Sequence, residues 1–288
     1  MRVTVLGAGV VGVASAWYLA ADGHEVTVIE RQPLPAQETS FANGGQISVS
    51  HAEPWANPRA PWTALKWLGR EDAPLLWRLR ADPAQWAWGL RFLRECTTAR
   101  ARANVGAIVR LGLASRAALQ SLRRELGLEY DQLERGILHF YTDAREFEHA
   151  IPQAALMRDF GCERVPQTAA ECLAIEPALA GSRVPIVGGT YTAGDESGDA
   201  RKFTQALAQR AALRGVRFRH GETVAGLECG GSRLTGVRLA SGECVAADIT
   251  VLALGSYSPL FLKPLGIRLP VYPAKGYSVT LALPDGVA

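Results

Sequence analysis

The chain has 288 residues, of which 48% are hydrophobic and 20% charged, and its formal net charge is +3. This is the composition of an ordinary globular protein, long enough for two domains. Five cysteines without a CxxC pair, together with only five histidines, do not indicate a metal site, and no nucleic-acid-binding module is recognisable.

The first thirty residues carry the most informative pattern. A short apolar run ends in Gly7, Gly9 and Gly12, a helical stretch follows, and a second apolar run ends in Glu30. In such a strand–helix–strand unit the glycines allow the tight turn, the approach of a pyrophosphate and the packing of the helix. The helix N-terminus attracts phosphate, and Glu30 can accept hydrogen bonds from ribose hydroxyls. The segment therefore predicts an adenine dinucleotide site.

Residues on and beside this turn are the first predicted cofactor contacts. They are Val3, Leu6, Gly7, Ala8, Gly9, Val10, Val11, Gly12, Glu30 and Arg31. Two alternatives compete, because residues 3–21 are uncharged and long enough to span a membrane, and the small residues at 14–16 imitate a signal-peptide cleavage site. Neither alternative explains Glu30 or the spacing of the glycines. In addition, Gly23 marks the end of a helix.

Residues 31–62 interrupt the expected alternation of strands and helices. Within this long loop, the small and amide residues of segment 38–46 suggest backbone held close to a ligand. Residues 63–126 are mostly helical in pattern, and Gly127 is a plausible stop. The apolar stripe predicted to face the core consists of Val105, Ile108, Val109, Leu119, Leu122 and Leu126.

The same helical region is basic and rich in tryptophan. Between Lys66 and Glu125 there are eleven arginines and one lysine against five acids, and Trp67, Trp77, Trp86 and Trp88 lie among them. One interpretation is a surface that contacts anionic lipid headgroups or an acidic partner. The alternative is a set of solvated helix faces whose arginine stems cover apolar surface.

The middle of the chain predicts a mixed domain. Strands are expected at 136–141 and 187–192, and a helix at 145–160 that Pro152 starts or kinks. Thr168 and Glu171 form a capping box for a short helix that ends before Pro177.

From Asp199 the pattern of a nucleotide-binding domain resumes. Asp199 caps a helix to about residue 213, strands follow at 216–218 and 222–227, and Ser241–Gly242 is a hairpin turn between 234–239 and 243–246. A buried strand at 249–255 ends in glycine. The predicted fold is α/β, a Rossmann-like domain split by an inserted α+β domain. Its parts are 1–48 and 193–265 for the nucleotide domain, 49–192 for the substrate or cap domain, and 266–288 for the start of a strand returning to the substrate domain.

Four motifs extend this pattern along nearly the whole chain. They are VLGAGVVGVASAWYL at 5–19, ETSFANGGQIS at 38–48, SGDARKF at 197–203 and YPAKGYS at 272–278. With them the chain resembles the two-dinucleotide-binding-domain flavoproteins, and within these the D-amino-acid oxidase superfamily. The resemblance is strongest to the small, catalytic subunits of bacterial D-amino acid dehydrogenases.

The resemblance implies FAD as the cofactor, with Glu30 on the adenosine ribose and Val224 against the adenine. It places Ser40, Asn43, Gly44 and Gln46 near the pyrophosphate and the flavin ring, and it adds Gly255 at the end of the last strand. NAD would suit Glu30 equally well, but the interrupted domain and the loop at 40–46 favour flavin.

The implied reaction is oxidation of a D-amino acid such as D-alanine to a 2-oxo acid and ammonia, with electrons passed to a respiratory acceptor, a quinone or a carrier. Hydride removal from Cα needs orientation and electrostatics rather than a protein nucleophile or a metal. The candidate catalytic residues are Tyr257, Lys275 and Tyr277, and none of them is assigned a role. An arginine that binds the substrate carboxylate is required.

Members of the family continue beyond residue 288, and the carboxylate-binding arginine is expected in that further segment. We therefore do not expect activity from these 288 residues alone. Two alternatives remain: an amine oxidase or dehydrogenase of the same superfamily acting on glycine, sarcosine or hydroxyproline, or an inactive truncated remnant. The expected location is cytoplasmic, with peripheral attachment to the inner face of the bacterial inner membrane as a further hypothesis.

Overall fold

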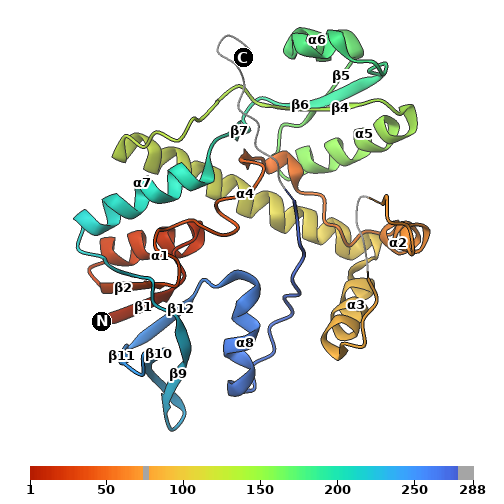
Figure 1. Cartoon of the computed structure of the whole chain (residues 1–288). Helices are drawn as coiled ribbons and strands as arrows, with labels where there is room; N and C mark the ends of the chain where they lie inside the picture. Colours follow the sequence, from red (N-terminus) through yellow and green to blue (C-terminus); the bar gives the residue numbers. More distant parts are fainter. Residues whose placement is uncertain (74–77, 278–288) are drawn as a thin grey trace. The chain divides into compact units, whose positions relative to one another are not determined.

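The computed structural model describes residues 1–73 and 78–277, and the chain divides into two compact units (Figure 1). Unit 1 comprises Met1–Gly45, Leu126–Asp131 and the chain from Asp199 onward, and unit 2 comprises Gln46–Glu125 and Gln132–Gly198. The boundaries expected from the sequence, 48/49 and 192/193, lie three and six residues from these. The return of the chain to unit 1 at Leu126–Asp131 has no counterpart in the expected division. Trp77 and residues 278–288 lie outside the described residues.

A four-stranded parallel sheet forms the centre of unit 1. Its order is β12 (Ile249–Leu252), β1 (Arg2–Leu6), β2 (Glu25–Glu30) and β8 (Arg217–His220). Such strands bury apolar side chains on both faces, as the sequences VTVL and EVTVIE require. Because the strands are parallel, their carboxyl ends lie along one edge, where ligands bind in open α/β sheets.

Two helices of unit 1 pack against each other (Figure 1). Helix α1 (Val10–Ala21) follows the glycine turn and ends at Asp22, with Gly23 in the left-handed region at φ +81°. Helix α7 (Ala200–Leu213) begins at Asp199, whose carboxylate accepts a hydrogen bond from the Lys202 N–H at 2.9 Å. Residues 3–21 therefore form a strand and a short helix rather than a membrane span. Within the described part of the chain, no helix combines the length and apolarity needed to cross a bilayer.

An antiparallel three-stranded sheet completes the regular structure of unit 1. It consists of β9 (Val224–Gly230), β10 (Arg233–Leu239) and β11 (Cys244–Ala246), joined as the hairpin signal at Gly242 predicts. After β12 come η3 (Gly255–Tyr257), α8 (Ser258–Leu262) and η4 (Lys263–Leu265). Residues 266–277 contain no strand, so the returning strand expected from residue 266 is not present in the part of that segment that is described.

Unit 2 combines helices with two small antiparallel sheets. Its helices are α2 (Ala60–Trp67), α3 (Pro83–Glu95), α4 (Thr98–Leu126), α5 (Ala144–Asp159) and α6 (Ala169–Ile175), with 3-10 turns η1 (Val49–His51) and η2 (Pro177–Gly181). One sheet has the order β4 (Ile137–Tyr141), β6 (Gly188–Thr192) and β5 (Val165–Gln167), and the other pairs β3 (Gln46–Ile47) with β7 (Glu196–Ser197). The α+β character expected for the inserted part is present.

The core of unit 2 tests several local expectations. Val105 and Val109 of α4 are buried in it with Met157, but Ile108 is 41% exposed, so its assignment to the core is wrong. Ile108 precedes Val109 in the helix, and consecutive residues of a helix point about 100° apart around its axis. The Ile108 side chain therefore lies outside a narrow apolar stripe.

Two local expectations concern the helices α5 and α6. Pro152 lies inside α5 and does not start it, whereas the capping box of Thr168 and Glu171 is confirmed.

Candidate functional site

The turn between β1 and α1 requires glycine at its first position. Gly7 has φ +97°, and its N–H donates to the carbonyl oxygen of Ile29 at 2.8 Å. A Cβ built on Gly7 would lie 2.7 Å from the carbonyl oxygen of Ala253. The chain therefore bends sharply here, between the carboxyl ends of β2 and β12, where only glycine fits.

The next two glycines keep the start of α1 open. A Cβ on Gly12 would lie 1.9 Å from the carbonyl oxygen of Gly7, and one on Gly9 would lie 3.3 Å from Ser40 Oγ. The first amides of a helix have no acceptor within it, and the helix dipole adds positive charge at this end. Bare backbone amides at the edge of a parallel sheet form a cradle that suits a pyrophosphate.

Glu30 closes the other side of this cradle. One oxygen of its carboxylate accepts from the Ala8 N–H at 2.7 Å, and the other accepts from the Gln32 N–H at 2.9 Å. Each carboxylate oxygen has a second acceptor position, so the group can also receive hydrogen bonds from a diol. The side chain is thus held in place at the ends of β1 and β2, as recognition of a ribose requires.

The loop predicted to lie along the cofactor is ordered by its own side chains. Ser40 Oγ accepts from the Val10 N–H at 3.0 Å, which leaves its hydroxyl proton available to a phosphate oxygen. The Asn43 side chain donates to the carbonyl oxygens of Thr39 and Ser40, and its Oδ1 accepts from the Gly45 N–H at 2.8 Å. Nothing lies within 4 Å of a Cβ built on Gly44. These contacts hold the loop near the N-terminus of α1 within unit 1.

The remaining predicted contacts lie in different surroundings. Val3 and Leu6 are buried in β1, and Leu6 packs with Val237 and Leu239. Arg31 contacts Glu38, and its guanidinium lies 4.4 Å from the centre of the Tyr257 ring. The other four positions can be listed by place: Val224 begins β9, Gly255 begins η3 with φ +52°, Gln46 lies on β3 in unit 2, and Val11 is exposed on α1.

Lys275 and Tyr277 lie in the irregular segment that follows η4. The Lys275 ammonium is 4.9 Å from the centre of the Tyr277 ring, and Tyr277 is 86% exposed. Nothing in their surroundings points to a catalytic group, and their assignment stays a prediction.

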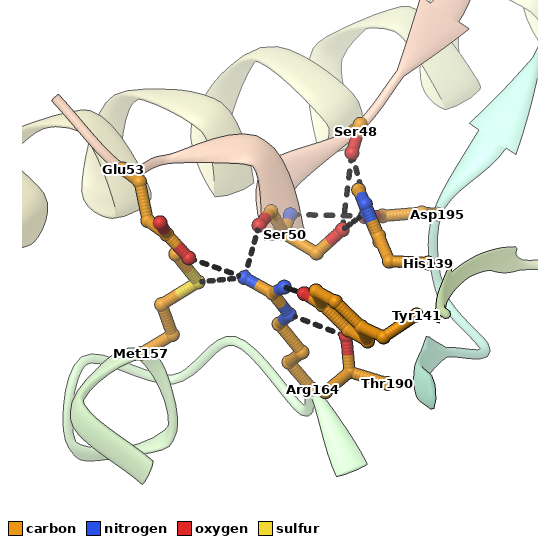
Figure 2. Close-up of polar contacts among 9 residues, drawn as sticks. All are labelled: Ser48, Ser50, Glu53, His139, Tyr141, Met157, Arg164, Thr190 and Asp195. Atoms are coloured by element: carbon orange, nitrogen blue, oxygen red, sulfur yellow. Dashed lines mark hydrogen bonds and ion pairs between the residues drawn. The ribbon is translucent and has the colours of Figure 1, made fainter. Parts of the chain in front are cut away.

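A buried polar cluster in unit 2 has no counterpart among the residues predicted from sequence (Figure 2). Arg164 donates to Thr190, to Tyr141 and to the carbonyl oxygen of Ser50 at 2.9, 3.0 and 3.2 Å. Asp195, which is fully buried, accepts from the backbone N–H groups of Val49 and Ser50. Two buried charges of opposite sign therefore bind the short turn η1.

His139 belongs to this cluster and is neutral at physiological pH. Its Nε2 lies 3.1 Å from Ser50 Oγ, and its ring stacks on His51 at 5.6 Å. Burial, followed by the positive charge of Arg164, lowers the pKa of His139 to about 4. His51 itself is exposed.

His139→Gln is expected to flatten the acid dependence of stability. In the unfolded chain His139 takes up a proton below its ordinary pKa of 6.5, whereas in the folded chain it stays neutral to about pH 4. The unfolded state therefore binds more protons in this window, and the wild type loses stability as pH falls from 6.5 to 4. Allowing for solvent screening, this loss is on the order of 1 kcal/mol. Urea unfolding at pH 7, 5.5 and 4.5 measures it; equal slopes in wild type and variant would contradict the assignment.

Comparison with known proteins identifies the family. Residues 2–287 match the DAO family, described as FAD dependent oxidoreductase. The chain belongs to this family. The resemblance, the split α/β fold and FAD as the cofactor, all predicted from the sequence, are thereby confirmed.

Close relatives among curated proteins cover almost all of the chain. It is 62% identical over 289 residues to a D-amino acid dehydrogenase of Dechloromonas aromatica, covering 99% of this chain and 69% of that protein. It is 56% identical over 282 residues to a D-amino acid dehydrogenase of Paramagnetospirillum magneticum, covering 98% of this chain and 67% of that protein.

Solved structures share the fold at low identity. The glycine oxidase of Geobacillus kaustophilus superposes with a TM-score of 0.67 at 22% identity, over 93% of this chain and 59% of that one. The L-proline dehydrogenase of P. horikoshii gives a TM-score of 0.65 at 20% identity, over 93% of this chain and 56% of that one. The chain therefore spans less than two thirds of these structures, and they establish the fold alone.

The residues of unit 1 fit the family's cofactor. A glycine turn that a side chain at Gly7 or Gly12 would distort, an amide-lined helix start and a fixed carboxylate at Glu30 are the groups that an adenosine diphosphate moiety needs. The individual contacts to FAD stay predictions.

Proposed function

We propose that this chain belongs to an FAD-dependent D-amino acid dehydrogenase, with unit 1 as its nucleotide-binding part and unit 2 as its inserted domain. The observation that supports it most is the 62% identity, over 99% of the chain, to a protein of that name. The glycine cradle at α1 supports the cofactor half of the proposal independently of any relative.

In this proposal the chain's residues bind and orient rather than attack. The amides at the start of α1 and the Ser40 hydroxyl hold the pyrophosphate, and Glu30 holds the ribose. Asn43 and Gln46 carry amides, which can both donate to and accept from the edge of a flavin ring. Both Nδ2 hydrogens of Asn43 are used inside its own loop, and Oδ1 keeps one acceptor position beside the Gly45 N–H, so Asn43 could accept a hydrogen bond from the flavin with little reordering.

The overall reaction balances without a protein nucleophile. Bound FAD supplies the two-electron acceptor for the hydride that leaves Cα of the substrate. The amino nitrogen loses a proton, the product is a 2-imino acid, and water converts it to a 2-oxo acid and ammonia. The chain's task is to hold the amine neutral and aligned, which is a matter of orientation and of excluding water.

An anaerobic titration tests this proposal. Flavin absorbance in the purified protein that D-alanine, but not L-alanine, bleaches would support the proposal. A colourless protein would indicate an inactive remnant. Bleaching by glycine or sarcosine, with none by D-alanine, would instead indicate an amine oxidase of the same family.

We further propose a respiratory acceptor for the electrons and a peripheral contact of unit 2 with an anionic membrane. On α3, Trp86, Leu90 and Leu93 recur at helical spacing and are all at least half exposed. Trp62 of α2 is 75% exposed, and Lys66 lies one turn further along the same helix. An exposed apolar stripe among cations is typical of helices that lie in the membrane interface. A quinone acceptor in the bilayer would explain such a contact.

Flotation with vesicles tests the membrane contact. The protein is expected to float with vesicles containing phosphatidylglycerol and not with neutral ones, less so at high salt. Leu90→Gln with Leu93→Gln should abolish flotation, whereas Leu111→Gln on α4, which is 72% exposed, serves as the matched control. If the wild-type protein does not float with the vesicles, the membrane contact is refuted. If light scattering shows a dimer of the chain, the exposed apolar stripe would instead contact a second copy of the protein.

A further inference from the structure

Arg31 links the ends of two strands that are not neighbours in the parallel sheet of unit 1. It follows Glu30, the last residue of β2, and its guanidinium lies 4.4 Å from the centre of the Tyr257 ring. Tyr257 ends η3, the turn that follows β12. Because β1 lies between β12 and β2, this contact passes the carboxyl end of β1, where the glycine turn begins.

A loop segment brings a second partner of Arg31 to the same turn. The Ala36 N–H donates to the carbonyl oxygen of Ala8 at 3.0 Å, and Ser40 Oγ accepts from the first N–H of α1 at 3.0 Å. The segment between these two contacts therefore runs along the glycine turn. Glu38 lies in its middle and accepts from Arg31 Nε at 2.7 Å. Both partners thus hold the Arg31 side chain beside the turn.

The charges around the turn favour a cation when a diphosphate is bound. Glu30 and Glu38 both place carboxylates beside the turn, and helix α1 has no charged side chain. A diphosphate adds further negative charge, and like charges brought together repel each other. Arg31 offsets this repulsion. Because a guanidinium has more N–H groups than one carboxylate accepts, it can bind Glu38 and a phosphate oxygen together.

The ring of Tyr257 restrains the guanidinium without neutralising it. The side chains of Arg31 and Glu38 are 41% and 40% exposed, so water competes with their ion pair, which alone is a weak restraint. The face of an aromatic ring attracts a cation and leaves the N–H groups at its edge free for other acceptors. Tyr257 therefore fixes the place of the positive charge and leaves it available to a phosphate.

We propose that Arg31 binds the diphosphate of the cofactor and that Tyr257 is the positioning residue that holds Arg31 at the glycine turn. Every residue in this arrangement belongs to unit 1. The inference rests on the cofactor part of the proposed function, and it gives Tyr257 a role in cofactor binding rather than in the chemistry of the substrate.

Binding of ADP and of adenosine to the protein freed of flavin tests the inference, since the two ligands differ in the diphosphate. In isothermal titration calorimetry, Arg31→Met is expected to weaken ADP binding about tenfold or more, the loss typical of a charge-assisted hydrogen bond. Tyr257→Leu should weaken it about two- to fivefold, as an exposed cation–π contact predicts. Adenosine binding should stay unchanged in both variants, which also shows that they are folded.

Two controls separate the diphosphate contact from general effects of charge and stacking. The loss of ADP affinity in Arg31→Met should shrink at high salt, because salt screens a partly exposed charge. Arg214→Met removes another stacked guanidinium of unit 1, which lies 3.7 Å from the centre of the Trp17 ring in the C-terminal half of α1. This variant should bind both ligands as the wild type does.

A double variant shows whether Tyr257 acts through Arg31. In an Arg31→Met background, Tyr257→Leu should change ADP binding by less than about twofold, because the cation that it positions is missing. A full further loss there would overturn the inference, as would wild-type ADP binding in Arg31→Met or an equal loss of adenosine binding. A wild type that binds neither ligand would instead refute the cofactor part of the proposed function.

Discussion

Gly12→Ala is expected to yield a protein that folds but binds FAD about ten- to hundredfold more weakly. The added Cβ would lie 1.9 Å from the carbonyl oxygen of Gly7, which is backbone and cannot rotate away. Gly7 is itself confined, since its own Cβ position lies 2.7 Å from the Ala253 carbonyl oxygen. The start of α1 must therefore move off the sheet edge, and the amides move with it. An overpacking cost of about 1–3 kcal/mol corresponds to a roughly ten- to hundredfold weaker cofactor affinity.

The ratio of flavin to protein absorbance after purification measures this effect, and titration of the apoprotein with FAD gives the affinity. Gly23→Ala is the matched control, because it lies at the other end of α1, where a Cβ meets nothing within 4 Å. Its left-handed φ makes alanine cost about 1 kcal/mol of stability there, with FAD binding unchanged. Normal FAD content in Gly12→Ala would mean that the cradle is not the cofactor site.

The part of the site near α1 was predictable because its signals are local. Gly7, Gly9 and Gly12 lie within six residues of one another. Gly7 is required locally by its positive φ of 97°, and Gly12 by its contact with the Gly7 carbonyl oxygen, so both requirements arise inside one strand–turn–helix unit. The cap at Asp199 and the capping box at Thr168 are equally short-range, since a side chain binds a backbone amide three residues away. Such interactions leave a readable spacing in the sequence.

The polar cluster of unit 2 was not predictable in the same way. Asp195 and Val49 are 146 residues apart, and Arg164 and Ser50 are 114 apart. No spacing rule connects such pairs, because the tertiary fold brings them together. One signal did exist, namely the two consecutive acids Asp195 and Glu196 beside a short strand, but it names no partner. Acids that are fully buried must have partners, and sequence alone does not name them.

The exact division of the chain into two units could not be predicted from the sequence pattern either. Leu126–Asp131 returns to unit 1 directly after α4, and Tyr130 is buried there edge-on against Phe203 of α7. Nothing in a run of six residues after a helix indicates which domain it joins. The contact with an element seventy residues further along determines it.

Arg123→Met is expected to destabilise unit 2 by about 3–5 kcal/mol, the cost typical of breaking a buried ion pair. Arg123 lies on α4 with only 9% of its side chain exposed, and its Nη1 is 2.6 Å from Glu196 Oε2. Glu196 is 3% exposed and is also contacted by Gln120. Without Arg123, most of a carboxylate's charge would remain buried beside a neutral amide. Six of the seven tryptophans lie between residues 55 and 88, so the fluorescence change in urea follows unit 2.

Arg102→Met on the same helix provides the control, because Arg102 is 59% exposed and its pair with Asp159 at 3.4 Å should be worth no more than about 1 kcal/mol. Adding Glu196→Met to Arg123→Met removes the stranded carboxylate and replaces both charges by apolar chains of similar length. The double variant should therefore regain part of the lost stability, since an apolar pair often substitutes for a buried ion pair without loss. If the free energy of unfolding of the double variant is instead lower than that of Arg123→Met by as much as Glu196→Met alone costs, the effects of the two substitutions are additive and the two side chains do not stabilise each other. The buried charge of Glu196 would then be stabilised by Gln120 and its other surroundings rather than by Arg123.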